Sequence, residues 1–146
     1  METEDLLKNV KLFSGLSQKN IKRIAKRFKE RSFKAGEAVV EQGKQGVGLF
    51  VIVSGSVKIM KKTAAGDEFE VAVNGPGDFI GEMSVLDDAP RSASVVAVED
   101  TKCLALVSWD FKALMHDKPE IALEILPVIV QRFRETNEKL LSMSSM

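Results

Sequence analysis

The most informative stretch of the sequence is residues 81–94, which read Gly-Glu-Met-Ser-Val-Leu-Asp-Asp-Ala-Pro-Arg-Ser-Ala-Ser. Gly81 has no Cβ and lets the backbone approach a ligand closely. The turn that opens at Gly81 and Glu82 leaves backbone N–H groups free, and such groups favour an anion. Arg91 can bind phosphate oxygens through forked, charge-assisted hydrogen bonds. The stretch is therefore typical of a pocket for one small phosphorylated ligand.

Glu82 is the unusual residue in this stretch, because a carboxylate repels a nearby phosphate. A carboxylate at this position makes chemical sense if it accepts a hydrogen bond from a sugar hydroxyl of the ligand. Glu82 and Arg91 together therefore indicate a ligand that carries both a sugar and a phosphate.

The stretch resembles the phosphate-binding cassette of cyclic nucleotide-binding domains, the family of the bacterial catabolite activator and of protein kinase regulatory subunits. Gly81, Glu82, Arg91 and Ala93 fall at the family's spacing, and Pro90 stands where many members have it. Framework runs that look like those of the family are Phe13–Leu16, Lys34–Glu37, Gly55–Val57 and Gly75–Phe79. The resemblance therefore covers most of the chain.

This resemblance implies a role for each polar residue of the cassette. It implies that Glu82 takes the ribose 2′-hydroxyl, that Arg91 takes the cyclic phosphate, and that Ser92 adds a hydroxyl near the phosphate or the base. The predicted ligand-binding residues in this stretch are Gly81, Glu82, Met83, Ser84, Arg91, Ser92 and Ala93.

Short β-like runs separated by turn residues occupy the middle of the sequence. The candidate strands are residues 37–42, 47–54, 57–62, 68–73, 92–98 and 101–107. Many short strands at close spacing favour a jelly roll or a barrel. We therefore predict a mainly β fold with flanking helices: a β jelly-roll barrel (31–107) with N-terminal helices (1–30) and a long C-terminal helix pair (108–143). All of it forms one predicted domain, residues 1–146.

A helical period marks residues 17–30, with apolar residues on one face and lysine and arginine on the other. Ser17 is the expected N-cap. The basic face is typical of a solvated surface, and an anionic partner is the alternative interpretation.

The last predicted helix, residues 119–143, carries a second pattern. Its seam positions fall on alternate steps of four and three residues, which is the spacing of a coiled coil. They are Ala122, Leu126, Ile129, Phe133, Thr136, Leu140 and Met143. We predict that two chains form a homodimer through this helix. The alternative is that this face packs on the barrel.

Residues 132–139 resemble the C-helix of the catabolite activator. By that resemblance Arg132 lies near the phosphate or ribose, Thr136 near the purine, and Asn137 near the ligand of the other subunit. A solvated surface position is the alternative for Arg132 and Asn137.

Composition narrows the function classes. Lys and Arg together number 21, as do Asp and Glu, so no net charge calls for nucleic acid or membrane. No apolar run reaches the roughly 18 residues of a membrane helix, and no signal peptide opens the chain, so we expect a cytoplasmic protein. Cys103 is the only cysteine and His116 the only histidine, which speaks against an iron–sulfur cluster, haem or a histidine-rich metal site. We expect no metal and no cofactor.

We expect a regulatory module and not an enzyme, because no nucleophile–base pair is readable in the sequence. The module binds a cyclic nucleotide, changes conformation and controls an unidentified effector protein. One alternative is a catabolite-activator-type transcription regulator that lacks its DNA-binding domain, since the sequence contains no nucleic-acid-binding element. Another is an interaction scaffold that binds no ligand. Ser92, Thr136 and Asn137 can serve either purine edge, so cGMP stays open, and the resemblance favours cAMP.

Overall fold

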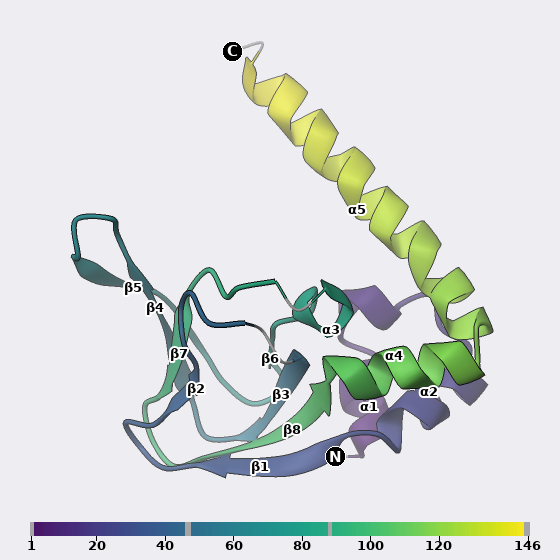
Figure 1. Cartoon of the computed structure of the whole chain (residues 1–146), viewed down its shortest axis with the longest axis horizontal. Coiled ribbons are helices and arrows are strands. Elements are labelled where there is room, and N and C mark those ends of the chain that lie inside the picture. Colours follow the sequence, from purple (N-terminus) through teal and green to yellow (C-terminus); the bar gives the residue numbers. More distant parts are fainter. Residues whose placement is uncertain (1, 46–47, 88, 145–146) are drawn as a thin grey trace. The chain divides into compact units, whose positions relative to one another are not determined.

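The computed structural model describes residues 2–45, 48–87 and 89–144 (Figure 1). The helices are α1 (Thr3–Leu7), the 3-10 helix η1 (Lys11–Phe13), α2 (Gln18–Ala25), α3 (Ser84–Asp87), α4 (Ser108–Asp117) and α5 (Glu120–Ser144). The strands are β1 (Lys29–Phe33), β2 (Ala38–Val40), β3 (Gly48–Ser54), β4 (Val57–Lys62), β5 (Glu68–Asn74), β6 (Phe79–Ile80), β7 (Ser94–Ala97) and β8 (Thr101–Val107).

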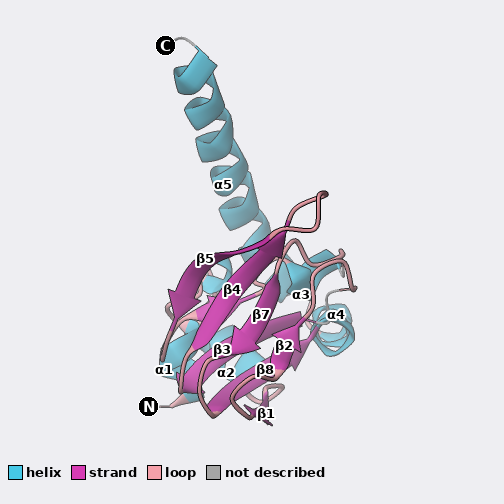
Figure 2. Cartoon of the chain, turned by 90° about the vertical axis from the view of Figure 1, so that its left-hand side faces the viewer, coloured by secondary structure: helices cyan, strands magenta, loops and turns pink. Residues whose placement is uncertain are grey.

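The strands of the described residues form two four-stranded sheets, ordered β1-β8-β3-β6 and β2-β7-β4-β5, and their paired strands are antiparallel. Figure 2 looks onto the second sheet, with the first sheet behind it. Buried side chains of both sheets form one apolar core, which includes Phe50 and Ile52 of β3, Val57 of β4 and Val95 of β7. The predicted jelly-roll-like fold with flanking helices and a long C-terminal helix is confirmed.

Most of the predicted strands appear in the structure. β4 and β8 match their predicted bounds, and β5 is one residue longer than predicted. β2 and β7 are shorter than the predicted runs 37–42 and 92–98. Val47, at the start of the run that contains β3, lies outside the described residues, as does Asp88 of the cassette.

The helix predicted over residues 17–30 is wrong in its last part. Its start is confirmed, because the Ser17 hydroxyl accepts a hydrogen bond from the Asn20 N–H at 3.3 Å. However, α2 ends at Ala25, and β1 begins at Lys29 and pairs with β8. Phe33 is the only buried residue of β1, so the sequence of this strand has no alternating apolar pattern that would predict it. The strand is defined by its backbone hydrogen bonds to β8. The N-terminal helices therefore end before residue 30.

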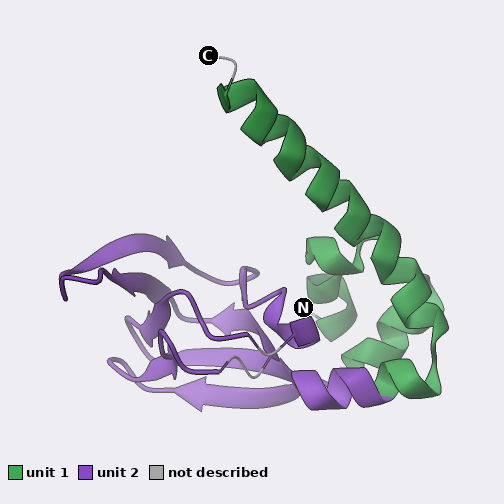
Figure 3. Ribbon diagram, turned by 45° about the horizontal axis from the view of Figure 1, so that its top comes forward, with its two compact units in different colours: residues 1–25, 114–146 green, residues 26–113 purple. Residues whose placement is uncertain are grey.

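The chain divides into two compact units, coloured separately in Figure 3. One unit combines residues 1–25 with 114–146, and the other holds residues 26–113, which include both sheets. The interpretation of residues 1–146 as a single domain stays a prediction. In the described part of the chain, no helix combines the length and apolar character that crossing a membrane requires.

A polar network joins α2 to the first turns of α5 within their own unit. The Glu124 carboxylate accepts hydrogen bonds from the Ser17 N–H at 3.1 Å and from the Asn20 side-chain amide at 2.9 Å. Arg23 donates to the Asn20 side-chain oxygen at 2.8 Å and forms an ion pair with Glu120 at 2.5 Å. The hydrogen bonds from Asn20 and Ser17 lower the pKa of Glu124, so this contact depends on the ionised carboxylate.

Candidate functional site

A cavity of about 330 Å³ lies in the unit of residues 26–113. Small-molecule sites span roughly 300–1,000 Å³ and combine apolar walls with a few polar groups. The strands supply apolar side chains, and the cassette supplies most of the remaining wall. The lining residues are Val40, Ile59, Phe79, Ile80, Gly81, Met83, Ser84, Pro90, Arg91, Ser92, Ala93 and Val95. The structure therefore brings six of the seven predicted cassette residues to one cavity.

Glu82, the remaining predicted cassette residue, is partly buried and stands between two lining residues, Gly81 and Met83. Glu82 itself is not one of the described residues that line the cavity. The predicted bond to a ribose hydroxyl stays a prediction.

Arg91 is the buried cation of this cavity, with 8% of its surface exposed. Its Nη2 donates a hydrogen bond to the Gly48 carbonyl oxygen at 2.6 Å. Its Nε is buried and has no hydrogen-bond partner among the described residues. Burial lowers the pKa of Arg91, and the nearby Asp87 carboxylate raises it by less. Because arginine stays protonated in proteins, the cavity wall contains a desolvated positive charge with unused donor capacity.

Gly81 allows this arginine to occupy its place. Its φ of +78° lies in the left-handed region, which side chains rarely adopt. An added Cβ would overlap Nη1 of Arg91 and would lie 2.6 Å from the Gly48 carbonyl oxygen. The glycine predicted to admit a ligand is thus also required by the packing of Arg91.

The segment that follows β2 fixes the backbone of Arg91. The Arg91 N–H donates to the Lys44 carbonyl at 2.8 Å, and the Gly43 N–H donates to the Arg91 carbonyl at 2.8 Å. Gln45 and Pro90 form a bridge of the same antiparallel kind. Within the cassette, the Ser84 N–H closes the glycine turn by donating to the Gly81 carbonyl at 3.0 Å. The cassette is therefore bonded to the segment after β2 near Arg91 and closed by its own turn at Gly81.

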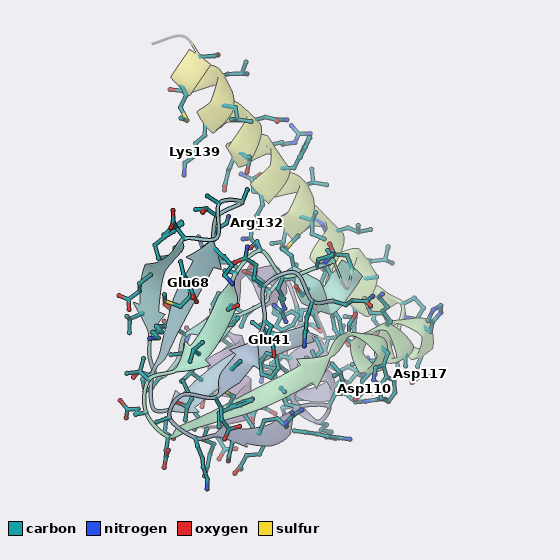
Figure 4. All side chains as sticks on the ribbon, turned by 60° about the vertical axis from the view of Figure 1, so that its left-hand side comes forward. Glu41, Glu68, Asp110, Asp117, Arg132 and Lys139 are labelled. Carbon is teal, nitrogen blue, oxygen red and sulfur yellow. The ribbon has the colours of Figure 1, made fainter. Side chains whose placement is uncertain are left out.

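Arg132, Thr136 and Asn137 lie on α5, in the other compact unit. Figure 4 labels Arg132 on this helix. The Thr136 hydroxyl donates to the Arg132 carbonyl at 2.9 Å within the helix, and Arg132 lines a groove of its own unit together with Lys11 and Ser14. The predicted contacts of these three residues with a ligand stay predictions.

The predicted seam of α5 is uncovered along much of its length in the described chain. Leu126 is 53% exposed, Phe133 66%, Leu140 59% and Met143 69%. Exposed large apolar residues at seven-residue spacing, as at 126, 133 and 140, are unusual on a solvated helix face.

Sequence reasoning missed two parts of the cavity. The first is the apolar wall formed by Val40, Ile59 and Val95. Alternation within the predicted strands carries that signal, because Val57, Ile59, Val95 and Ala97 share the inward parity. The second is the Gly48 carbonyl that bonds to Arg91, and a backbone acceptor has no signature in the sequence.

Comparison with known proteins agrees with this geometry. A family model described as a cyclic nucleotide-binding domain matches residues 30–118, a range that contains the whole lining of the cavity. The Cyclic AMP receptor protein of Thermus thermophilus is 37% identical over 134 residues, which are 92% of this chain and 62% of that protein. The cAMP-dependent protein kinase regulatory subunit of Mycosarcoma maydis is 38% identical over 98 residues, which are 67% of this chain and 18% of that protein.

A solved structure is similar over nearly the same length. The N-terminal domain of a transcriptional regulator from Streptomyces coelicolor A3(2) superposes with a TM-score of 0.84 at 31% identity, covering 92% of this chain and 94% of that chain. The names of these relatives describe receptor and regulatory proteins. The chain spans about three fifths of the length of the curated receptor of Thermus thermophilus and of a CRP-like cAMP-activated global transcriptional regulator of Mycobacterium tuberculosis, to which it is 29% identical.

Proposed function

The chain belongs to the cyclic nucleotide-binding domain family, and we propose that it binds cAMP in the cavity that Arg91 lines. The observation that carries this proposal is the buried guanidinium of Arg91, whose Nε is unbonded within the described residues. A desolvated cation of this kind is stabilised by an anion that accepts its free hydrogen bonds. A cyclic phosphate supplies such an anion, and the apolar wall around Ile59 and Val95 suits the less polar parts of a nucleotide.

Glu82 and Ser92 complete the proposed site. Glu82 accepts a hydrogen bond from the ribose 2′-hydroxyl, and Ser92, which is exposed, bonds the phosphate or the base. Met83, Ser84 and Ala93 contribute backbone and packing at the lining. Relatives named for cAMP favour adenine over guanine as the base.

The proposed role is that of a regulatory module. A ligand shifts a conformational equilibrium only if it binds one state better than the other. The first proposed partner is a second copy of the chain, which binds through the exposed seam of α5. The second is an effector protein that responds to the conformational change. We propose a homodimer because the apolar side chains at 126, 133 and 140 repeat at coiled-coil spacing and are exposed in the described chain.

A second candidate is the ligand-binding part of a transcription regulator. The specific observation in its favour is that the matched receptor of Thermus thermophilus is longer, since the alignment covers 92% of this chain and 62% of that protein. Both candidates share the ligand site and differ in the output. Sequencing the gene to its end separates them.

Calorimetric titration with cAMP, cGMP and 5′-AMP tests the ligand. We expect one cAMP per chain, weaker cGMP binding, and little 5′-AMP binding. A thermal melt should rise in parallel, because a hundredfold excess over Kd adds ~2.7 kcal/mol to the free energy of unfolding. If neither cyclic nucleotide binds or shifts the melt at millimolar concentration, the proposed function is wrong.

A further inference from the structure

Gln42, which lies between β2 and the segment bonded to Arg91, extends the backbone ladder of β4. The β7 strand starts at Ser94, opposite Met60, so the paired part of β4 on that side ends before Lys62. At Lys62 the side-chain amide of Gln42 stands in the place of a β7 residue and makes the backbone hydrogen bonds. The Lys62 N–H donates to Gln42 Oε1 at 2.7 Å, and Gln42 Nε2 donates to the Lys62 carbonyl at 3.0 Å. One carboxamide thus satisfies both backbone groups of this residue, as a neighbouring strand would.

The backbone around Gln42 is bonded to the cassette at the same time. The Gln42 N–H donates to the Ser94 hydroxyl at 2.8 Å, and the next residue, Gly43, donates its N–H to the Arg91 carbonyl at 2.8 Å. Arg91 and the end of β4 are therefore bonded to adjacent residues of one short segment. The Gln42 side chain is the group that joins this segment to Lys62.

This contact borders a polar cleft of about 550 Å³. The cleft is lined by Gln42 and Ser94 on one side and by Lys62 and Glu68 of the β4–β5 hairpin on the other. Figure 4 labels Glu41 and Glu68, which both line it. Water has access to the outer half of the hairpin, whose residues 61–70 are exposed. Its two strands are paired with each other as far as Lys62 and Glu68, and the Gln42 amide adds hydrogen bonds on the other side of Lys62.

We propose that Gln42 is a positioning residue that couples the ligand site to the β4–β5 hairpin. When cAMP is bound by Arg91, the segment 42–44 opens less often, and the hydrogen bonds of the Gln42 amide reduce the opening of the backbone at Lys62 as well. This inference rests on the proposed function. A ligand that rigidifies one bonded segment reduces the local opening of the segments bonded to it, and amide hydrogen exchange measures that opening. The Lys62 N–H is a direct reporter, because it is the donor to Gln42 Oε1.

Hydrogen exchange with and without cAMP, in the parent and in Gln42→Ala, tests the coupling. In the ligand-free parent we expect the Lys62 amide to exchange about fivefold more slowly than in Gln42→Ala, as befits one lost hydrogen bond. Saturating cAMP should slow Lys62 further in the parent and leave it unchanged in Gln42→Ala. The ladder amides of residues 103–105 in β8, none of which lines the cavity, serve as an internal reference that a local change leaves alone.

Two further variants separate positioning from general damage. Gln42→Glu retains an oxygen that accepts from the Lys62 N–H but places a second oxygen, in place of the donor, beside the Lys62 carbonyl. We therefore expect it to restore the slow exchange and its response to cAMP in part. Gln45→Ala removes an exposed amide from the same segment, and we expect parental behaviour. If Gln42→Ala binds cAMP and its Lys62 amide slows as in the parent, the coupling is refuted while cAMP binding stands. If the parent itself binds no cyclic nucleotide, the coupling and the proposed function fail together.

Discussion

The cavity of Arg91 and the seam of α5 both present groups without a partner in the described chain, but the groups differ in kind. The cavity presents one buried guanidinium with an unbonded Nε, placed by Gly81 and by the Gly48 carbonyl. The seam presents repeated apolar side chains on an exposed helix face. A buried charge selects a single chemical partner, whereas a periodic apolar stripe selects any surface with the same repeat.

This difference determines how the two regions respond to substitution. The proposed binding in the cavity depends on individual atoms, so we expect one side chain to govern ligand binding and its neighbours to modulate it. The proposed dimer contact is spread over several similar residues of the seam, so we expect an apolar replacement to be tolerated and a charge to disrupt the contact. The following experiments test this contrast, beginning with the largest expected effect.

Arg91→Ala should lower the affinity for cAMP by about thirtyfold to a few thousandfold, or roughly 2–5 kcal/mol. The reason is that the cyclic phosphate would lose its buried ion pair. Isothermal calorimetry measures the change. The matched control is Arg134→Ala, which removes an exposed arginine from α5 and should bind as the parent does. Equal affinity for Arg91→Ala and the parent would remove the cavity as the ligand site.

Phe133→Glu should weaken dimerisation about a hundredfold, because the two-fold contact would desolvate an unpaired carboxylate in each chain. Light scattering across a dilution series measures the dissociation constant. Leu141→Glu is the control, since Leu141 is 69% exposed and lies off the predicted seam. A parent that scatters as a monomer, with and without cAMP, would contradict the predicted dimer.

The sequence predicted individual residues of the cavity but only a repeating pattern for the seam. The cassette was readable because glycine, glutamate and arginine have distinct chemistry at fixed spacing, and the structure places most of them around one cavity. The seam was predicted from periodicity alone, and its pairing with a second chain stays a prediction. β1 was not readable: its side chains are polar except for Phe33, and the strand exists because β8 offers it a backbone partner. Contacts made by backbone atoms, such as the Gly48 carbonyl, leave no trace in residue types.

Gly81→Ala sharpens the comparison within the cavity. It should reduce cAMP affinity roughly tenfold to thirtyfold, because its Cβ would displace the Arg91 guanidinium. The left-handed backbone should also cost about 1–2 kcal/mol of stability. Gly36→Ala is a matched control: its φ is +89° and an added Cβ would meet nothing within 4 Å. Melting temperature should fall in both variants, and affinity only in Gly81→Ala. A loss of affinity in both would mean that backbone strain and not Arg91 explains the effect.

Glu82→Ala should cost at most about fivefold in affinity. The variant loses one hydrogen bond to a neutral hydroxyl, worth ~1 kcal/mol, and gains some relief of repulsion from the phosphate. The informative measurement compares the affinities of the parent and Glu82→Ala for cAMP and for 2′-deoxy-cAMP. The deoxy ligand should bind Glu82→Ala and the parent nearly equally. An undiminished penalty with the deoxy ligand would assign Glu82 to the fold of the cassette and not to the ribose.

Glu124→Gln gives the smallest expected effect and tests the unit that contains the seam. The hydrogen bonds from Asn20 and Ser17 lower the pKa of Glu124 below its ordinary 4.5. A carboxylate with a lowered pKa in the folded state contributes stability that is fully present above the unfolded pKa and is lost as pH falls through the folded pKa.

The introduced amide would keep an acceptor oxygen without the charge, and exposed charge-assisted contacts contribute little. At pH 7 we therefore expect Glu124→Gln to melt about 1–2 °C below the parent, a gap that closes as pH falls below the ordinary pKa of 4.5 and through the lower pKa of the folded state. Glu138→Gln, an exposed glutamate farther along α5, should show no such gap. A gap that persists unchanged at pH 3 would mean that the shape of the side chain, and not its charge, joins α2 to α5.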